Sequence, residues 1–186
     1  MRNLYLCVIT LIILSGCASS RKTTVVYNKP GKEIKSTVIL KEKIPSKTIN
    51  TKSVAASKVV QFAETLEGTP YKYGSTDPKK GLDCSGFIYH VFQKFKISVP
   101  RMSKEFTNAG QEVSTLESRR GDIILFTGSD PKSGVVGHMG IITENDKGVL
   151  KFIHSASGNN AGVMISGMNS YFMPRFVKVI RVFRVF

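Results

Sequence analysis

The chain has 186 residues and a formal net charge of +14 at pH 7. It contains no internal repeat, no phosphate-binding loop and no apolar run of the ~20 residues that a membrane-crossing helix needs. The excess of lysine and arginine suits an anionic surface such as wall polymer or lipid head groups. Nucleic acid is not an expected partner, because the basic residues are not interleaved with aromatic ones and because the chain begins with an export signal.

Residues 1–16 are predicted to be that signal. A basic start, Met1-Arg2-Asn3, precedes an apolar run that is too short to cross a bilayer. The run ends in Leu14-Ser15-Gly16-Cys17, which resembles a lipobox. This resemblance implies that Cys17 becomes the acylated N-terminus, with palmitate among its fatty acids, and anchors a lipoprotein to a membrane. The alternative is an ordinary cleaved signal followed by a chance cysteine.

The residues after Cys17 indicate which membrane the anchor would occupy. Ala18 and Ser19 follow Cys17 and offer no aspartate of the kind that retains some lipoproteins at the inner membrane. In a Gram-negative cell the expected location is therefore the outer membrane, with the protein facing the periplasm.

Residues 17–52 are predicted to be a basic, flexible tether. The segment carries nine basic residues and two acidic ones, and its apolar residues are too scattered for a core. Only Thr37 to Leu40 is expected to pair, as an edge strand. A flexible coil of this length reaches ~30 Å on average, and self-repulsion among lysines extends it further. The alternative is that the lysines merely keep a spacer solvated.

Residues 53–186 are predicted to form one domain that starts with helices. Apolar residues at helical spacing lie between Ser53 and Glu67, and Gly68 and Pro70 end that pattern. A second apolar stripe runs from Phe87 to Phe95, directly after Cys84, and is expected to form the central buried helix.

Strand patterns follow the helices. They cover Asp122 to Phe126, His138 to Thr143, Val149 to His154 and Val177 to Phe186. Turn-forming residues separate them, notably Glu144 to Gly148. Helices first and strands afterwards predict an α+β fold with the helices packed on a central antiparallel sheet.

Cys84 is the candidate nucleophile. Cys7 leaves with the signal and Cys17 is expected to be acylated, so Cys84 is the one thiol left, and no intramolecular disulfide is possible. With Asp83 as helix N-cap, Cys84 occupies the first turn, where unpaired N–H groups favour an anion. The dipole contributes only ~1 kcal/mol, whereas a papain-type thiolate requires a pKa shift of ~5 units. A histidine partner is therefore required.

Two of the three histidines are candidates for that role. His90 lies six residues beyond Cys84 on the same helix and faces away from it, so it is assigned to structure. His138 and His154 lie in neighbouring strand patterns that can present both rings side by side. His138 is the expected base, and His154 is expected to orient it. Gly140, two residues after His138, leaves room for a neighbouring element to approach closely.

The ordered motifs of residues 54–186 resemble those of the NlpC/P60 cysteine peptidases. They are Gly68-Thr69-Pro70-Tyr71-Lys72-Tyr73-Gly74, Asp83-Cys84-Ser85-Gly86-Phe87, Pro100-Arg101-Met102-Ser103, Arg120-Gly121-Asp122-Ile123-Ile124-Leu125-Phe126, Gly137-His138-Met139-Gly140-Ile141 and Ile153-His154-Ser155. The resemblance implies a papain-like fold and hydrolysis of peptidoglycan stem peptides, at the bond from γ-D-glutamyl to a diamino acid or at a cross-link. Tyr73, where the family often has tryptophan, and Ser75, where it often has glycine, are departures that leave the proposed chemistry intact.

The resemblance also implies roles for individual residues. Cys84 becomes the nucleophile, His138 the base and His154 the orienting third member. Tyr71 is expected to place its hydroxyl near the sulfur. A second group, Asp83, Ser85 and Ser103, matches positions that contact the free amine of a stem peptide in some relatives.

Several alternatives stay open at this point. Within enzymes, a thiol amidase or acyltransferase acting on wall peptides or lipids uses the same order of cysteine and histidine. From another class, a catalytically silent, wall-binding lipoprotein would retain the same fold. A zinc site at Cys84, His138 and His154 has suitable ligand types but no short ligand pair and no evident fourth ligand. Neither a metal nor an organic cofactor is therefore expected.

Overall fold

The structure is a computed structural model that describes residues 22–29, 32–39, 49–158 and 161–183. The chain divides into two compact units, Met1–Lys43 and Ile44–Phe186. Residues 1–16, Cys17 and the predicted lipid anchor lie outside the described residues. Within the described residues, no helix combines the length and the apolar character needed to cross a membrane.

The first unit contains a two-stranded antiparallel hairpin. Strand β1 (Lys22–Lys29) pairs with β2 (Lys32–Ile39), in a register that runs from Lys22 opposite Ile39 to Lys29 opposite Lys32. The sequence predicted pairing only at the end of this segment, from Thr37 to Leu40. The longer pairing agrees with the sequence on either side of Pro30-Gly31, where two runs rich in valine, isoleucine and threonine flank a dipeptide typical of turns.

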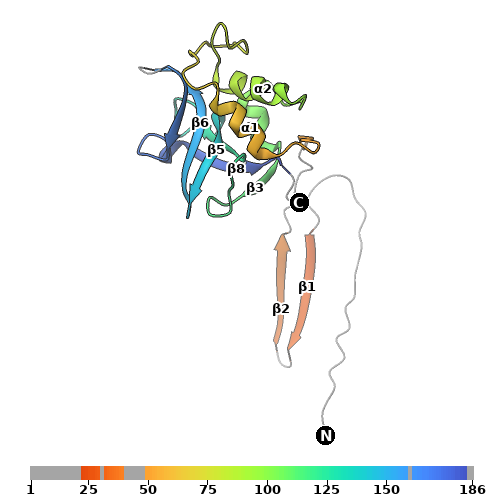
Figure 1. Cartoon of the computed structure of the whole chain (residues 1–186). Helices are drawn as coiled ribbons and strands as arrows, with labels where there is room; N and C mark the ends of the chain where they lie inside the picture. The colour runs from red at the N-terminus through yellow and green to blue at the C-terminus, as the bar shows by residue number, and fades with distance from the viewer. Residues whose placement is uncertain (1–21, 30–31, 40–48, 159–160, 184–186) are drawn as a thin grey trace. The chain divides into compact units, whose positions relative to one another are not determined.

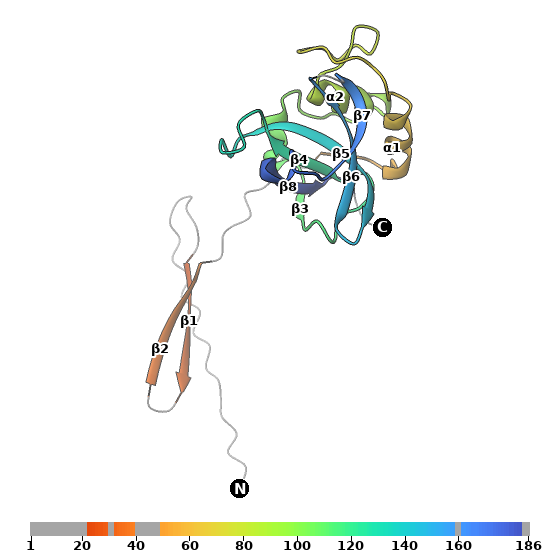
Figure 2. The same ribbon diagram turned by 90° about the vertical axis from the view of Figure 1, so that its left-hand side faces the viewer.

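In its described residues, the second unit contains two α-helices and a six-stranded sheet (Figures 1 and 2). Helix α1 spans Ala56–Glu64 and helix α2 spans Cys84–Lys94. Both helices contact β5 of the sheet, and α2 also contacts β6. The predicted α+β class, with helices packed on an antiparallel sheet, is confirmed.

The sheet has the strand order β3-β8-β4-β5-β6-β7, and each neighbouring pair is antiparallel. The strands with predicted counterparts are β4 (Ile123–Thr127), β5 (Val136–Asp146), β6 (Val149–Ala156) and β8 (Phe176–Arg181). The sequence did not predict β3 (Gln111–Val113), β7 (Gly162–Gly167) or the 3-10 helix η2 (Met173–Arg175). A further 3-10 helix, η1, spans Ser103–Asn108.

The sheet has an apolar cluster on each face. One cluster joins the sheet to both helices and is built from side chains such as Val59, Phe87, Ile88, Leu125 and Ile153. The other is Ile124, Phe126, Ile142, Leu150, Phe152, Phe172 and Val179. Because strand side chains alternate between faces, His138, Gly140 and Ile142 belong to the second face, together with Phe152 and His154 of β6.

Core packing reaches slightly beyond the predicted start of the domain at residue 53. Ile49 is 6% exposed and Thr51 is 4% exposed, and the N–H of Ile49 donates to the carbonyl of Ala109. Among the described residues, the packed domain therefore begins at Ile49, four residues before the predicted boundary.

The Arg120-Gly121-Asp122 motif links the start of β4 to helix α1 and to strands β5 and β8. Arg120 pairs with Glu64 of α1 at 2.7 Å and donates to the carbonyl of Thr143. Asp122 is 3% exposed and accepts two hydrogen bonds from the guanidinium of Arg181. These contacts give the motif a structural role.

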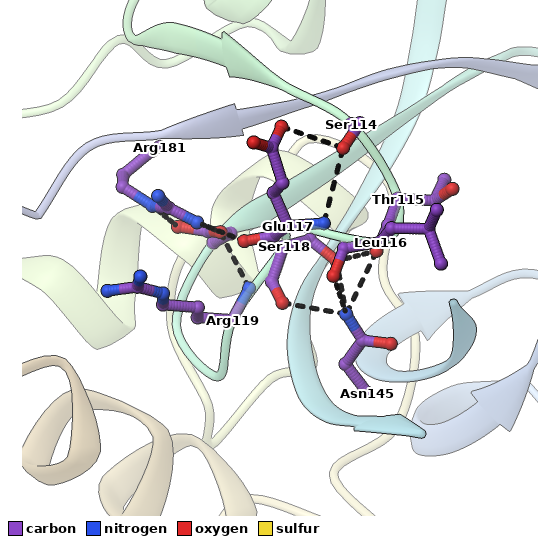
Figure 3. Close-up of polar contacts among 9 residues, drawn as sticks. Ser114, Thr115, Leu116, Glu117, Ser118, Arg119, Asn145 and Arg181 are labelled. Carbon is purple, nitrogen blue, oxygen red and sulfur yellow. Dashed lines mark hydrogen bonds and ion pairs between the residues drawn. The ribbon is translucent and has the colours of Figure 1, made fainter. Parts of the chain in front are cut away.

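The loop Ser114–Arg119, before β4, packs on the far end of β5 (Figure 3). The side-chain amide of Asn145 lies 2.9 Å from the carbonyl oxygen of Thr115 and 2.7 Å from that of Ser118, and Arg181 donates to the carbonyl of Glu117. A polar cleft of about 490 Å³ lies beside this loop, lined by residues that include Arg119, Asn145 and Arg181. Asn145 is seven residues along β5 from His138, roughly 24 Å at ~3.4 Å per residue, so this cleft is remote from the two histidines.

Candidate active site

The start of α2 is shaped around Cys84. Asp83 is the N-cap residue, and its side chain accepts the backbone N–H of Gly86 at 2.6 Å. Gly86 must lack a side chain here, because a Cβ would collide with the carbonyl oxygen of Ser75. The Asp-Cys-Ser-Gly sequence thus combines a cap, a thiol in the first turn and a close backbone contact, as the N-cap prediction required.

Arg101 completes the cap. Its guanidinium makes two hydrogen bonds to the Asp83 carboxylate, of 2.6 and 3.1 Å, and one of 2.9 Å to the hydroxyl of Ser85. Burial alone would raise the pKa of Asp83, but the Arg101 hydrogen bonds and the Gly86 N–H outweigh it and lower the pKa. Both carboxylate oxygens of Asp83 are therefore already engaged within the protein.

The sulfur of Cys84 lies against the sheet where β5 begins. It is 3.8 Å from the carbonyl oxygen of Gly137, the residue immediately before His138. Ser103, the first residue of η1, donates its hydroxyl to the carbonyl of Val136 at 3.4 Å. The structure thus brings Cys84, Ser103 and the first residues of β5 to one place.

The two histidines contact each other directly. Nε2 of His138 lies 2.9 Å from Nδ1 of His154, with the ring planes at 82°. The other ring nitrogen of His154 lies 2.8 Å from the hydroxyl oxygen of Ser166 on β7. With its Nε2 engaged in this way, Nδ1 is the ring nitrogen of His138 that is left to exchange a proton.

Gly140 makes the contact between the histidines possible. A Cβ on Gly140 would stand 2.9 Å from the carbonyl oxygen of Ile153 and 3.2 Å from the Cβ of His154. The prediction that Gly140 leaves room for a neighbouring element is confirmed, and that element is the segment of β6 that carries His154.

The surroundings favour neutral groups at the site. Burial, followed by the charge of Asp83, raises the pKa of Cys84 to about 11. Burial lowers the pKa of His138 to about 4 and, together with His138, that of His154 to about 3. The sequence led us to expect a thiolate with a lowered pKa, but the pKa of Cys84 shifts in the opposite direction. The loss of water around the buried sulfur outweighs the favourable backbone N–H groups of Ser85 and Cys84.

Tyr71 lies near the start of α2, and His90 lies within that helix. The backbone of Tyr71 forms a bridge with Leu82, two residues before Cys84, and burial followed by electrostatic interaction with Cys84 raises the pKa of Tyr71. His90 packs its ring against Phe62 of α1, with 6.0 Å between the ring centroids.

Three residues near the site were not assigned by sequence reasoning. Arg101 lies within the Pro100-Arg101-Met102-Ser103 motif, and this position was the sequence signal that could have marked it as a site residue. Phe172 packs against both histidine rings, at 6.3 Å from His138 and 5.4 Å from His154. Ser166 lies in a strand that the sequence did not predict, and no local pattern marks it.

The described residues contain no group of three or more His, Cys, Asp or Glu side chains that could hold a metal ion. A cysteine at a helix start beside a histidine of an antiparallel sheet is the arrangement used by thiol-dependent enzymes. The sequence pattern of the NlpC/P60 family matches residues 68–181, more than half of the chain. The chain belongs to the NlpC/P60 family, as its motifs predicted.

Two relatives illustrate the range of the family. The chain is 41% identical over 126 residues to the probable peptidoglycan endopeptidase LytE of Bacillus subtilis, which covers 67% of this chain but 34% of LytE. It is 29% identical over 177 residues to the murein DD-endopeptidase/LD-carboxypeptidase MepS of Escherichia coli, which covers 92% of this chain and 87% of MepS. The chain thus spans about a third of the first relative and most of the second.

Solved structures share the fold. A Staphylococcus aureus protein described as similar to lipoprotein, NLP/P60 family, matches with a TM-score of 0.59 and 27% identity, over 70% of this chain and 42% of that one. The NlpC/p60 domain of the peptidoglycan hydrolase SagA matches with a TM-score of 0.55 and 28% identity, over 69% of this chain and 99% of that domain.

Proposed function

We propose that the protein is a cysteine endopeptidase that cuts peptide bonds in peptidoglycan stem peptides, either from γ-D-glutamyl to a diamino acid or at a cross-link. One observation carries the proposal. The sulfur of Cys84 lies 3.8 Å from the carbonyl oxygen of Gly137, the residue before His138, and Nε2 of His138 is already held by His154. The names of the relatives, which are peptidoglycan and murein endopeptidases, support the substrate class.

The chemistry begins with a neutral pair. Nδ1 of His138 takes the thiol proton while the sulfur of Cys84 attacks the scissile carbonyl carbon, so that a C–S bond forms and the carbonyl oxygen becomes an oxyanion. The backbone N–H groups of Cys84 and Ser85 lie toward the sulfur and are suited to stabilise that oxyanion. His138 then gives its proton to the leaving amine, and water releases the acyl group by the reverse sequence.

The residues around the thiol supply the remaining roles. Tyr71, which pairs with Leu82 just before the helix start, is proposed to contact the substrate, as are Ser103 beside Val136 and the pair Asp83 and Ser85. Because Arg101 already occupies both oxygens of Asp83, a substrate amine would contact this carboxylate only by sharing it with the guanidinium.

Attachment to a membrane is part of the proposal. Acylation of Cys17 after removal of residues 1–16 would anchor the chain, with an outer membrane facing the periplasm as the proposed location. The S. aureus protein of the same fold, described as similar to lipoprotein, supports this. Mass analysis of the mature N-terminus should find acyl chains on Cys17. An unmodified cysteine there would refute the anchor and leave the peptidase proposal intact.

The peptidase proposal is tested with the full chain and purified peptidoglycan. Mass spectrometry of the released fragments should identify a cut stem-peptide bond, and Cys84→Ala should release none. His90→Gln is the matched histidine control, since His90 packs on Phe62 away from the thiol, and it should retain activity. Continued cutting by Cys84→Ala would refute the mechanism. Acyl transfer without net cutting, or binding without cutting, would replace the endopeptidase by a thiol acyltransferase or a silent wall-binding protein.

A further inference from the structure

Three polar side chains stand in a row across three neighbouring strands. His138 of β5 contacts His154 of β6 at 2.9 Å, and His154 contacts Ser166 of β7 at 2.8 Å. Met164 is directly opposite His154, so Ser166, two residues further along β7, is its diagonal neighbour on the same face. The row therefore follows from the register of β5, β6 and β7, which are neighbours in the sheet (Figure 2).

We infer that Ser166 is a positioning residue for the catalytic histidines: it accepts a hydrogen bond from His154 and thereby holds the proton-free nitrogen of His138 toward Cys84. The inference rests on the proposed function, because it assigns a purpose to the row only if His138 acts as the base. No motif in the sequence and no comparison assigns Ser166 a role.

Proton counting gives the direction of each hydrogen bond. For His138 to accept the thiol proton, Nδ1 must carry a lone pair, so the single proton of the neutral ring sits on Nε2. That N–H donates to Nδ1 of His154, which must then be the proton-free nitrogen of its own ring. The proton of His154 is accordingly on Nε2, and it donates to the Ser166 oxygen.

Protonation of His138 leaves this order unchanged. The thiol proton arrives at Nδ1, and Nε2 still donates to His154, so His154 still needs an acceptor for its own N–H. Reversing both rings would instead place the proton of His138 on Nδ1, the nitrogen that has to accept the thiol proton, and His138 would then be unable to act as a base. The productive arrangement therefore needs a hydrogen-bond acceptor at the end of the row, and the Ser166 oxygen supplies one.

Water is poorly placed to replace Ser166. His154 is 1% exposed, and the rings of Phe152 and Phe172 lie at 5.0 and 5.4 Å from it. Ser166 itself is half-buried, and within the described part of the chain its hydroxyl makes no other hydrogen bond. Its own proton is thus free to turn to solvent while its oxygen accepts from His154.

The titratable and charged groups around the row are few. At the start of α2, Cys84 lies 3.8 Å from the carbonyl oxygen of Gly137, the residue before His138, and the neighbouring Asp83 is bound by Arg101, while Tyr71 pairs through its backbone with Leu82. On the remaining sides β4, β6 and the segment before η2 contribute the aromatic rings of Phe126, Phe152 and Phe172. A pH profile of the thiol therefore reports mainly on Cys84, its immediate neighbours and the two histidines.

The test compares Ser166→Ala with Ser166→Thr in the full chain, using Ser170→Ala, at an exposed position in the loop after β7, as the matched control. Ser166→Ala should lower kcat for stem-peptide cleavage about 10-fold to 100-fold with little change in KM, because a buried N–H is left without an acceptor. Alkylation of Cys84 by iodoacetamide at pH 7 should slow in parallel. Ser166→Thr, which keeps the hydroxyl, should restore both rates to within about 3-fold of the original.

A second measurement keeps the inference testable if Ser166→Ala fails to fold. Nitrogen-15 spectra of the unaltered protein should show the proton on Nε2 of both His138 and His154, and a proton on Nδ1 of His138 would overturn the inference. Unchanged kcat and alkylation in a folded Ser166→Ala would overturn it equally. If the unaltered protein cuts no wall peptide but its alkylation rate depends on Ser166, the proposed function fails while the positioning role stands.

Discussion

Gly140 and His154 are neighbours across two strands, and the absence of a side chain on the first makes room for the second. A Cβ on Gly140 would lie 3.2 Å from the Cβ of His154 and 2.9 Å from the ring of Phe152. The contact between the two histidine rings thus depends on a residue that contributes no functional group, because only a bare backbone lets β6 bring His154 against His138.

Gly140→Ala should separate the two rings. The added methyl group must push back either the β6 backbone at Ile153 or the buried ring of Phe152, and overpacking of this kind typically costs about 1–3 kcal/mol. We expect lower stability in urea unfolding and a loss of peptidase activity greater than the loss of folded protein. Gly167→Ala is the control, since its Cβ would meet only the Leu150 carbonyl at 3.9 Å. Equal activity of the two variants would refute the role of Gly140.

The ion pair between Arg101 and Asp83 should make stability depend on pH. The pKa of Asp83 is lowered below its ordinary value of 3.8, so the carboxylate stabilises the fold above that pH, and the contribution is lost as pH falls through the lower, folded-state value. Arg101→Met should therefore destabilise the protein at pH 7 by about 1–3 kcal/mol, the typical cost of a hydrogen bond to a charged group. The difference from the unaltered protein should shrink at pH 3. Urea unfolding at both pH values measures it, and an equal difference at both would exclude this origin.

The parts of the fold that the sequence predicted share strong local signals. The Asp83 cap, the apolar stripe after Cys84 and the alternating pattern around His138 are each recorded within a few neighbouring residues. Strand β7 escaped prediction because its sequence, Gly162–Gly167, shows little alternation and becomes a strand only by pairing with β6.

The same distinction applies to the site. Cys84, His138 and His154 were identifiable from motifs, whereas the hydrogen bond to Ser166 depends on the diagonal register between β6 and β7. The sign of the shift in the Cys84 pKa was also out of reach, because the helix start visible in the sequence favours the thiolate while the burial visible only in the fold opposes it.

The raised pKa of Cys84 predicts how the thiol reacts. Because burial raises this pKa to about 11, the thiolate fraction of the substrate-free protein should increase steadily from pH 7 to pH 10. Alkylation by iodoacetamide should accelerate over that range, by nearly 10-fold per pH unit. In Arg101→Met the reaction at pH 8 should be slower still, since the guanidinium lowers the pKa of the thiol. A rate that is already constant above pH 5 would show instead that Cys84 and His138 form an ion pair before substrate binds.

The two histidines should limit stability on the acid side. Burial holds the pKa of His138 at about 4 and that of His154 at about 3, below the ordinary value of 6.5. Groups with lowered pKa values bind protons more readily when unfolded, so their contribution is complete above pH 6.5 and is lost as pH falls toward 4 and then 3. We expect the free energy of unfolding to fall between pH 7 and pH 4 by on the order of 3 kcal/mol for each of the two rings. His154→Gln keeps a polar side chain without the titration and should flatten that decline, whereas His90→Gln should leave it intact. A decline of the same size in His154→Gln would assign the acid sensitivity to groups outside the site.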